Sequence, residues 1–90
     1  MSVASRNVQL TNRRGLHARA SAKFVTLAAG QTASVEVEKD GSSVCATSIM
    51  GLMMLGAAMG DTITIRAEGD GAEQAVDALA ALVEERFGEE

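Results

Sequence analysis

Two alternating stretches joined by an Asp-Gly pair constrain the fold of this chain most. Polar and apolar residues alternate over 33–37 and again around Val44 and Ala46, with Asp40-Gly41 between the two runs. Asp-Gly is a preferred sequence for the two-residue turn of a β-hairpin, because both central positions of that turn take a positive φ. The sequence therefore predicts an antiparallel hairpin with one apolar face.

The same kind of pattern predicts elements on either side of the hairpin. Alternation indicates one strand over 6–11 and another over 61–67, the latter with Ile63 and Ile65 inward. Apolar residues at helical spacing predict a helix from Ala18 to a C-terminal cap at Gly30, and an amphipathic helix over 72–87. A short helix is expected over 49–55, with Thr47-Ser48 supplying its N-cap.

The predicted order is β-α-β-β-α-β-α, which favours a single fold class. Four half-buried strands and three one-sided helices are best satisfied by an α+β, two-layer open-faced sandwich. In it, three helices cover one face of a four-stranded antiparallel sheet, and the polar face of the sheet meets water. Ninety residues form one domain, 1–90. Cys45 is expected to be a buried small hydrophobe within its strand.

Composition excludes several classes of function. The chain has 8 basic and 12 acidic residues and a net charge of −4, which argues against nucleic-acid binding. One histidine and one cysteine cannot assemble a usual metal site, and a single cysteine forms no internal disulfide. The longest apolar run, 49–59, is too short to span a membrane, and no signal peptide is recognisable. The expected location is therefore the cytoplasm.

The only histidine of the chain, His17, lies in the stretch Arg14-Gly15-Leu16-His17-Ala18-Arg19-Ala20. A glycine permits an unusual backbone turn, and His17 follows it where the helical pattern begins. The free N–H groups and the dipole at a helix N-terminus favour an anion. Imidazole is the side chain best able to act as a nucleophile near neutral pH. This stretch is therefore where we expect chemistry.

Two motifs in this element order resemble a known family. They are Gly15-Leu16-His17-Ala18-Arg19 and Ser48-Ile49-Met50-Gly51-Leu52-Met53, which opens the second helix. Together they are similar to the histidine-containing phosphocarrier family HPr of the bacterial phosphoenolpyruvate:sugar phosphotransferase system. The resemblance implies a carrier rather than a stand-alone enzyme, with no cofactor.

In that family, enzyme I would pass its phosphoryl group to Nδ1 of His17, giving a pros-phosphohistidine. His17 would then hand the group to a histidine of an enzyme II A-type domain. Arg19 would contact the phosphoryl oxygens and stabilise charge during transfer, and the backbone N–H groups of Ala18 and Ala20 would help to bind them. The family usually has proline where this chain has Ala20, so an extra N–H is available and some rigidity is lost.

The second motif implies regulation and docking. Ser48 would be phosphorylated by an HPr kinase/phosphorylase, although Thr47 stands where lysine often precedes that serine. Leu52 and Leu55 are assigned to the core, whereas the residues on another side of the helix form an exposed partner-binding patch. That patch consists of Ile49, Met50 and Met53.

Other interpretations stay open. Ser48 could be a plain N-cap, the methionines could fill the core, and Arg19, Arg13 and Arg14 could be solvated charges. The chain could instead be a small-molecule-binding regulatory domain or an interaction-only adaptor, neither of which needs a phosphohistidine. A monomer is the expected state, and the sequence leaves open whether the acceptor belongs to sugar transport or to a nitrogen-regulatory branch.

Overall fold

The computed structural model describes residues 2–89. The elements follow in the order β1 (Val3–Gln9), α1 (Ala18–Ala29), β2 (Ser34–Lys39), β3 (Ser42–Cys45), α2 (Ile49–Met54), β4 (Thr62–Glu68) and α3 (Ala72–Glu84), and a 3-10 turn, η1 (Arg86–Gly88), follows α3. This is the predicted order of strands and helices, and the α+β open-faced sandwich is confirmed.

The four strands form one antiparallel sheet in the order β1-β4-β2-β3. β4 lies in the centre, where it pairs with β1 through Val8 opposite Ile63 and with β2 through Val37 opposite Ile65. Ile63 and Ile65 are fully buried, as their alternation predicts. The side chains of Asn7, Gln9, Glu36 and Thr62, on the other face, are exposed.

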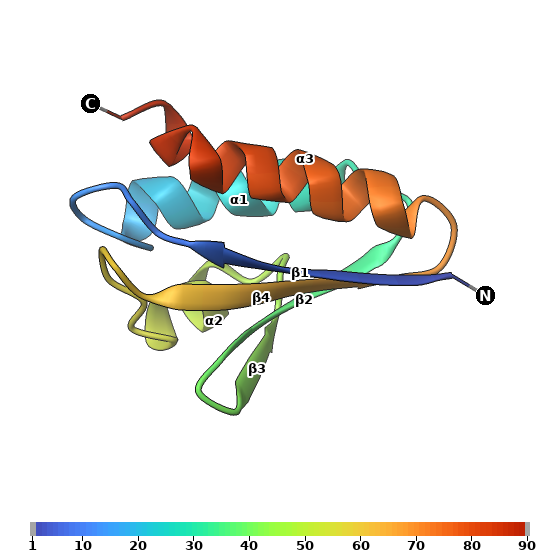
Figure 1. The fold of residues 1–90 in the computed structure, drawn as a ribbon, viewed down its shortest axis with the longest axis horizontal. Coiled ribbons are helices and arrows are strands. Elements are labelled where there is room, and N and C mark those ends of the chain that lie inside the picture. The colour runs from blue at the N-terminus through green and yellow to red at the C-terminus, as the bar shows by residue number, and fades with distance from the viewer. Residues whose placement is uncertain (1, 90) are drawn as a thin grey trace.

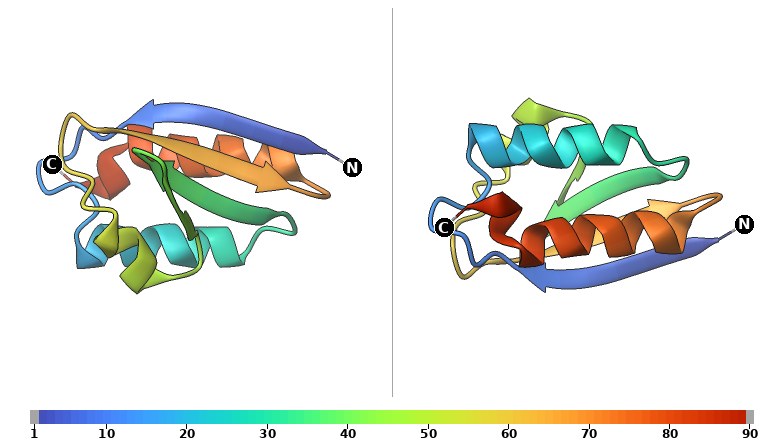
Figure 2. Two further views of the ribbon diagram at one scale, coloured as in Figure 1. Left: turned by 90° about the horizontal axis from the view of Figure 1, so that it is seen from below. Right: turned by 90° about the horizontal axis from the view of Figure 1, so that it is seen from above.

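Helices α1 and α3 lie side by side across one face of the sheet (Figure 1). The shorter α2 lies beside the N-terminal half of α1 (Figure 2), below the level of α1 and α3 in Figure 1. The core between the layers is built from side chains of both, among them Phe24 and Leu79 from the helices and Val37 from the sheet, all fully buried. The side chain of Leu52, from α2, is fully buried in the same core.

The predicted hairpin is confirmed. Val37 pairs with Val44 across it, and Asp40 and Gly41 in the turn have φ of 52° and 85°. Two positive φ values in succession are what a tight turn between twisted strands requires. The C-terminal cap of α1 at Gly30 and the N-cap of α2 at Ser48 are likewise confirmed.

Three predictions differ from the structure. The first strand spans Val3–Gln9 rather than 6–11, because Leu10 leaves the ladder of β1 while its side chain remains buried. The last helix ends at Glu84, because Arg86 and Phe87 have φ of 58° and 56°, values through which no α-helix can continue. The apolar stripe extends to Phe87 all the same, since its side chain packs into the core from η1.

Cys45 is the third difference, because it is exposed rather than buried. Successive side chains of a strand point to opposite faces. Since Val44 packs against the core and Ala46 is buried, Cys45 between them faces outward, opposite Glu36 of β2. The alternation that predicted the strand therefore also places this thiol in solvent.

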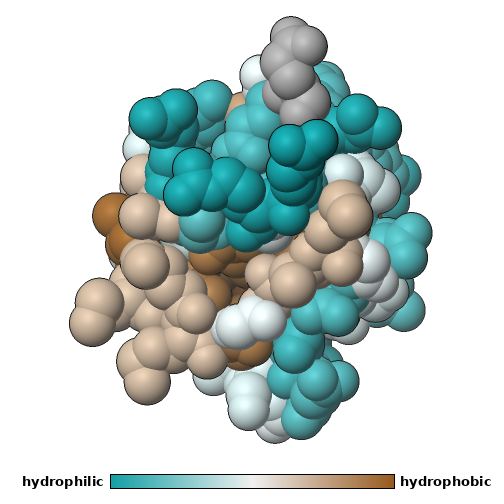
Figure 3. Space-filling model, turned by 90° about the vertical axis from the view of Figure 1, so that its left-hand side faces the viewer, coloured by the Kyte–Doolittle hydropathy of each residue, from teal (hydrophilic) through white to brown (hydrophobic). Residues whose placement is uncertain are grey.

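Exposed apolar side chains gather at one end of the molecule. Ile49, Met50, Met53 and Met54 come from α2, and Met59 comes from the loop that follows. Figure 3 shows apolar surface in the lower half of this end, beneath a band of hydrophilic side chains. We call these five residues the methionine patch. Within residues 2–89, no helix is long and apolar enough to cross a membrane.

Candidate functional site

The turn before α1 is fixed by Gly15. Its φ is +60°, and a Cβ there would clash with the carbonyl oxygen of Ala57 and lie 2.7 Å from Cα of Ala58. The next residue, Leu16, donates its N–H to that same Ala57 carbonyl at 3.0 Å and buries its side chain. Only glycine fits so close to the 57–58 backbone. The turn thus joins two loops and places His17 at the start of α1.

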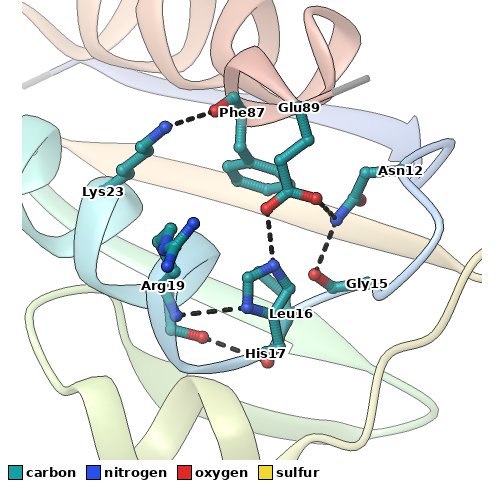
Figure 4. Close-up of polar contacts among 9 residues, drawn as sticks. Asn12, Gly15, Leu16, His17, Arg19, Lys23, Phe87 and Glu89 are labelled. Atoms are coloured by element: carbon teal, nitrogen blue, oxygen red, sulfur yellow. Dashed lines mark hydrogen bonds and ion pairs between the residues drawn. The ribbon is translucent and has the colours of Figure 1, made fainter.

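His17 is the N-cap residue of α1, with an extended backbone and a side chain that caps the helix. Its Nδ1 accepts a hydrogen bond from the N–H of Arg19 at 3.2 Å (Figure 4). Since Nδ1 accepts, the proton of the neutral ring lies on Nε2. The lone pair of Nδ1 therefore points at the helix N-terminus, where an anion would be stabilised.

Nε2 of His17 contacts a carboxylate from the far end of the chain. Oε2 of Glu89 lies 2.5 Å from Nε2, and Oε1 of Glu89 accepts from Nδ2 of Asn12 at 3.1 Å (Figure 4). Partial burial alone would raise the pKa of Glu89. The hydrogen bonds from His17 and Asn12, with the nearby charge of Lys23, bring that pKa below its ordinary value.

Asn12 is a buried side chain that orients the carboxylate of Glu89. It is 1% exposed, and Nδ2 also donates to the carbonyl of Gly15 at 2.8 Å. Both partners of Nδ2 are acceptors, so the orientation of the amide is determined by its contacts. Its Oδ1 is buried and has no hydrogen-bond partner among residues 2–89. Asn12 thus serves this site as a double donor.

The predicted phosphoryl-binding residues occupy the first turn of α1. The earliest N–H with a partner in the helix backbone is that of Ser21, which bonds to the carbonyl of His17 at 2.8 Å. Ala18, Arg19 and Ala20 therefore have no partner within the helix for their N–H groups. Ala20 is fully buried, and the side chain of Arg19 is exposed. The structure brings these residues together with His17.

Ser48 caps α2, and its Oγ accepts from the N–H of Gly51 at 2.9 Å. A Cβ on Gly51 would lie 3.1 Å from that Oγ and 3.2 Å from Cβ of Val44, so this glycine allows the close approach of α2 to β3. Leu52 is fully buried and Leu55 packs against the core, whereas Ile49, Met50 and Met53 are 40%, 69% and 42% exposed. The assignment of these five side chains to core and surface is confirmed.

Sequence reasoning missed several residues at the site. Glu89 and Lys23 carried no signal, because their contacts join distant segments of the chain. Asn12 lies in the loop before His17, but its contact with Glu89 spans 77 positions. Met54 and Met59 of the methionine patch were also missed, although their side chains are 79% and 59% exposed. The uncharged run 49–59 could have indicated these two methionines. Among residues 2–89, no three His, Cys, Asp or Glu side chains are placed to hold a metal ion.

Known proteins resemble this chain over nearly its whole length. The family model described as "PTS HPr component phosphorylation site" matches residues 4–85. The phosphocarrier protein HPr of Cupriavidus necator is 46% identical over 84 residues, which cover 93% of this chain and 94% of the relative. The phosphocarrier protein NPr of Shewanella violacea is 39% identical and covers 99% of this chain and 98% of its own length.

Solved structures show the same fold. HPr from Thermoanaerobacter tengcongensis superimposes with a TM-score of 0.93 at 44% identity, over 97% of this chain and 98% of that chain. Fold and matching sequence define the class: this is a phosphocarrier of the phosphotransferase-system type. Within that class, the chain belongs to the HPr family.

Proposed function

We propose that this chain accepts a phosphoryl group from phospho-enzyme I on Nδ1 of His17 and passes it to an enzyme II A-type domain. The observation that carries the proposal is the position of Nδ1, whose lone pair faces the first turn of α1. Neutral imidazole is nucleophilic, and its phosphorylated ring remains a good leaving group, so transfer can run in both directions. A carrier of this kind works in the cytoplasm as a single domain, 1–90.

The first turn of α1 would hold the transferred group. The N–H of Arg19 now bonds to Nδ1, and a phosphoryl oxygen would replace Nδ1 as its acceptor. Ala18 and Ala20 supply further N–H groups, and the exposed guanidinium of Arg19 supplies charge-assisted bonds. Where proline is usual in the family, Ala20 contributes one donor more. These groups favour the charge that develops during transfer.

The methionine patch would receive the protein partners. α2 runs beside the N-terminal half of α1, so the patch and His17 belong to the same end of the molecule (Figures 2 and 3). Flexible thioether side chains suit a surface that fits several unlike partners. Phosphorylation of Ser48 would place a dianion beside this patch and weaken docking of enzyme I.

The oligomeric state is a separate matter. We propose a monomer, as for a carrier that presents one histidine to successive partners. Among solved relatives, one structure is described as an HPr dimer from Thermoanaerobacter tengcongensis, and Crh of Bacillus subtilis is described as a domain-swapped dimer. Sedimentation of this chain at micromolar concentration tests the proposal, and a dimer would contradict it.

The test of the carrier function is incubation with phosphoenolpyruvate and enzyme I, followed by intact-mass measurement under alkaline conditions. We expect a gain of one phosphoryl group that is labile to acid and absent in His17→Ala. An Arg13→Ala variant serves as control, because this exposed arginine lies in the same loop. Phosphorylation of His17→Ala would refute the proposal, as would a wild-type chain that stays unmodified.

A further inference from the structure

The chain ends in a turn that a helix would not make by itself. After α3, three successive residues, Arg86, Phe87 and Gly88, have φ of 58°, 56° and 76°. Left-handed backbone is disfavoured for residues with a Cβ, so two of these three need support from their surroundings. The turn ends the helix, and the chain beyond it places Glu89 beside His17 at the N-terminus of α1 (Figure 4).

Packing and hydrogen bonds support this turn. The ring of Phe87 is 1% exposed, and its carbonyl accepts from Nζ of Lys23, on α1, at 2.7 Å. The N–H of Glu89 bonds to the carbonyl of Arg86 at 2.8 Å. The position of Glu89 is thus determined by an apolar anchor and a bond to the helix that carries His17.

At the end of this turn, both oxygens of the Glu89 carboxylate are used. One contacts Nε2 of His17 and the other accepts from Asn12, which the loop before α1 holds in place. The His17 side chain is 15% exposed and that of Glu89 is 21% exposed, so water competes little for this contact. When a carboxylate accepts the N–H of one ring nitrogen, the other ring nitrogen carries the lone pair.

We propose that Glu89 is a positioning residue for phosphoryl transfer, which keeps the proton of His17 on Nε2 so that Nδ1 is the nucleophile. This inference rests on the proposed carrier function. Asn12 and Lys23 act through Glu89, the first by orienting its carboxylate and the second by holding the turn that carries it.

The transfer step balances with these groups. The lone pair of Nδ1 forms the new bond to phosphorus, while the bond between phosphorus and the donor breaks and the donor leaves with that electron pair. The proton stays on Nε2 throughout, and the Glu89 carboxylate balances the positive charge that spreads over the ring. On the return step, the ring leaves phosphorus as neutral imidazole with its Nε2 proton still bonded to Glu89.

Two variants of Glu89 and one control test the role. Glu89→Ala removes both charge and acceptor, whereas Glu89→Gln keeps an acceptor oxygen without the charge. Glu85→Gln is the control, because this exposed glutamate precedes the turn and its side chain forms none of the contacts found among residues 2–89. Ring ¹⁵N NMR in mildly alkaline buffer reports which nitrogen of His17 carries the proton. Transfer from phospho-enzyme I is measured in parallel, with kcat and KM separated.

We expect the wild-type and Glu85→Gln chains to hold the proton on Nε2, and Glu89→Ala to show a mixture of both tautomers. Glu89→Gln is expected to keep the tautomer. The kcat for transfer should fall about tenfold in both Glu89 variants with little change in KM, as for loss of one charge-assisted hydrogen bond in the transition state.

An unchanged tautomer and kcat in Glu89→Ala would overturn the positioning role. A rise in KM at constant kcat would overturn it too, because Glu89 would then act in docking. A wild-type chain that enzyme I does not phosphorylate would instead overturn the carrier function, and the positioning role with it.

Discussion

At the scale of single residues, the setting of His17 depends on side chains distant from it in sequence. Gly15 allows the loop to touch the 57–58 backbone, and Glu89 meets the imidazole across 72 positions of the chain. Asn12 links these two features, since its amide bonds to Gly15 and to Glu89. The reactivity we propose for His17 is therefore a property of this cluster.

The close approach at Gly15 predicts a large effect of one methyl group. Gly15→Ala should destabilise the fold by about 2 kcal/mol or more, because it adds a left-handed alanine and a clash with the carbonyl of Ala57. Urea denaturation measures the loss. Gly41→Ala is the control: φ there is +85°, but a Cβ meets nothing within 4 Å. Equal losses in the two variants would argue against the close approach.

The lowered pKa of Glu89 predicts a pH dependence of stability. A carboxyl whose pKa falls on folding stabilises the fold above its unfolded pKa of about 4.3, and this contribution disappears as the pH falls through the folded value. The free energy of unfolding of wild type should therefore exceed that of Glu89→Gln at pH 7, and the difference should shrink as the pH falls below the unfolded pKa. A difference that stays constant or grows in acid would contradict this sign. Glu85→Gln should differ little from wild type throughout this pH range.

At the scale of elements, α2 combines a structural and a proposed regulatory role in one residue. Ser48 caps the helix, while Leu52 ties it to the core and the methionine patch stays exposed. A short helix without charged residues would be a poor surface element unless its exposed side received a partner. Charge placed at Ser48 should consequently affect docking more than folding.

Ser48→Asp should keep the stability of the fold, because aspartate is as good an N-cap as serine and its charge suits a helix N-terminus. Its KM for phospho-enzyme I should rise about tenfold, as expected for an added charge at a protein interface. Ser48→Ala should do the opposite, losing about 1 kcal/mol of stability while transfer continues at the wild-type rate.

Two comparisons make this test specific. Ser42→Asp adds the same charge at an exposed position of β3 and should leave transfer unchanged. Met50→Asp, within the methionine patch, should raise KM as Ser48→Asp does. Transfer to Ser48→Asp at the unmodified rate would contradict the proposed interface.

At the scale of the whole molecule, the sheet carries α1 and α3 side by side, and this packing brings both ends of the site together. His17 lies at the N-terminus of α1, and the turn after α3 places Glu89 in contact with it (Figure 4). Phe87 joins the two, because its ring lies in the core while its carbonyl bonds to Lys23. The stability of the tail and the geometry of the site are therefore coupled.

Phe87→Ala should lower the free energy of unfolding by about 3 kcal/mol. This is the lower end of the range for replacing a buried phenylalanine by alanine, because a segment near the chain end can adjust to the missing ring. It should also loosen Glu89 and reproduce the mixed tautomer expected of Glu89→Ala. Urea denaturation and ring ¹⁵N NMR check the two effects. A destabilised variant in which His17 keeps its proton on Nε2 would show that the tail and the site are independent.

The sequence by itself indicated the elements, their order and the position of His17 at the N-terminus of α1. Periodicity, the Asp40-Gly41 turn and the caps at Gly30 and Ser48 are local signals, and the structure bears them out. The same patterns misplaced the end of α3, because an apolar stripe indicates which side chains are buried and not whether the backbone between them remains helical.

Only the tertiary structure decided what surrounds the imidazole. The contacts of Glu89 with His17 and Asn12 span 72 and 77 positions of the chain, and the packing of Gly15 against Ala57 likewise joins two separate loops. No local pattern encodes such contacts, since they depend on how the layers bring distant loops together. The sequence thus predicted the nucleophile, and the fold surrounds its two ring nitrogens with the carboxylate of Glu89 and the N–H of Arg19.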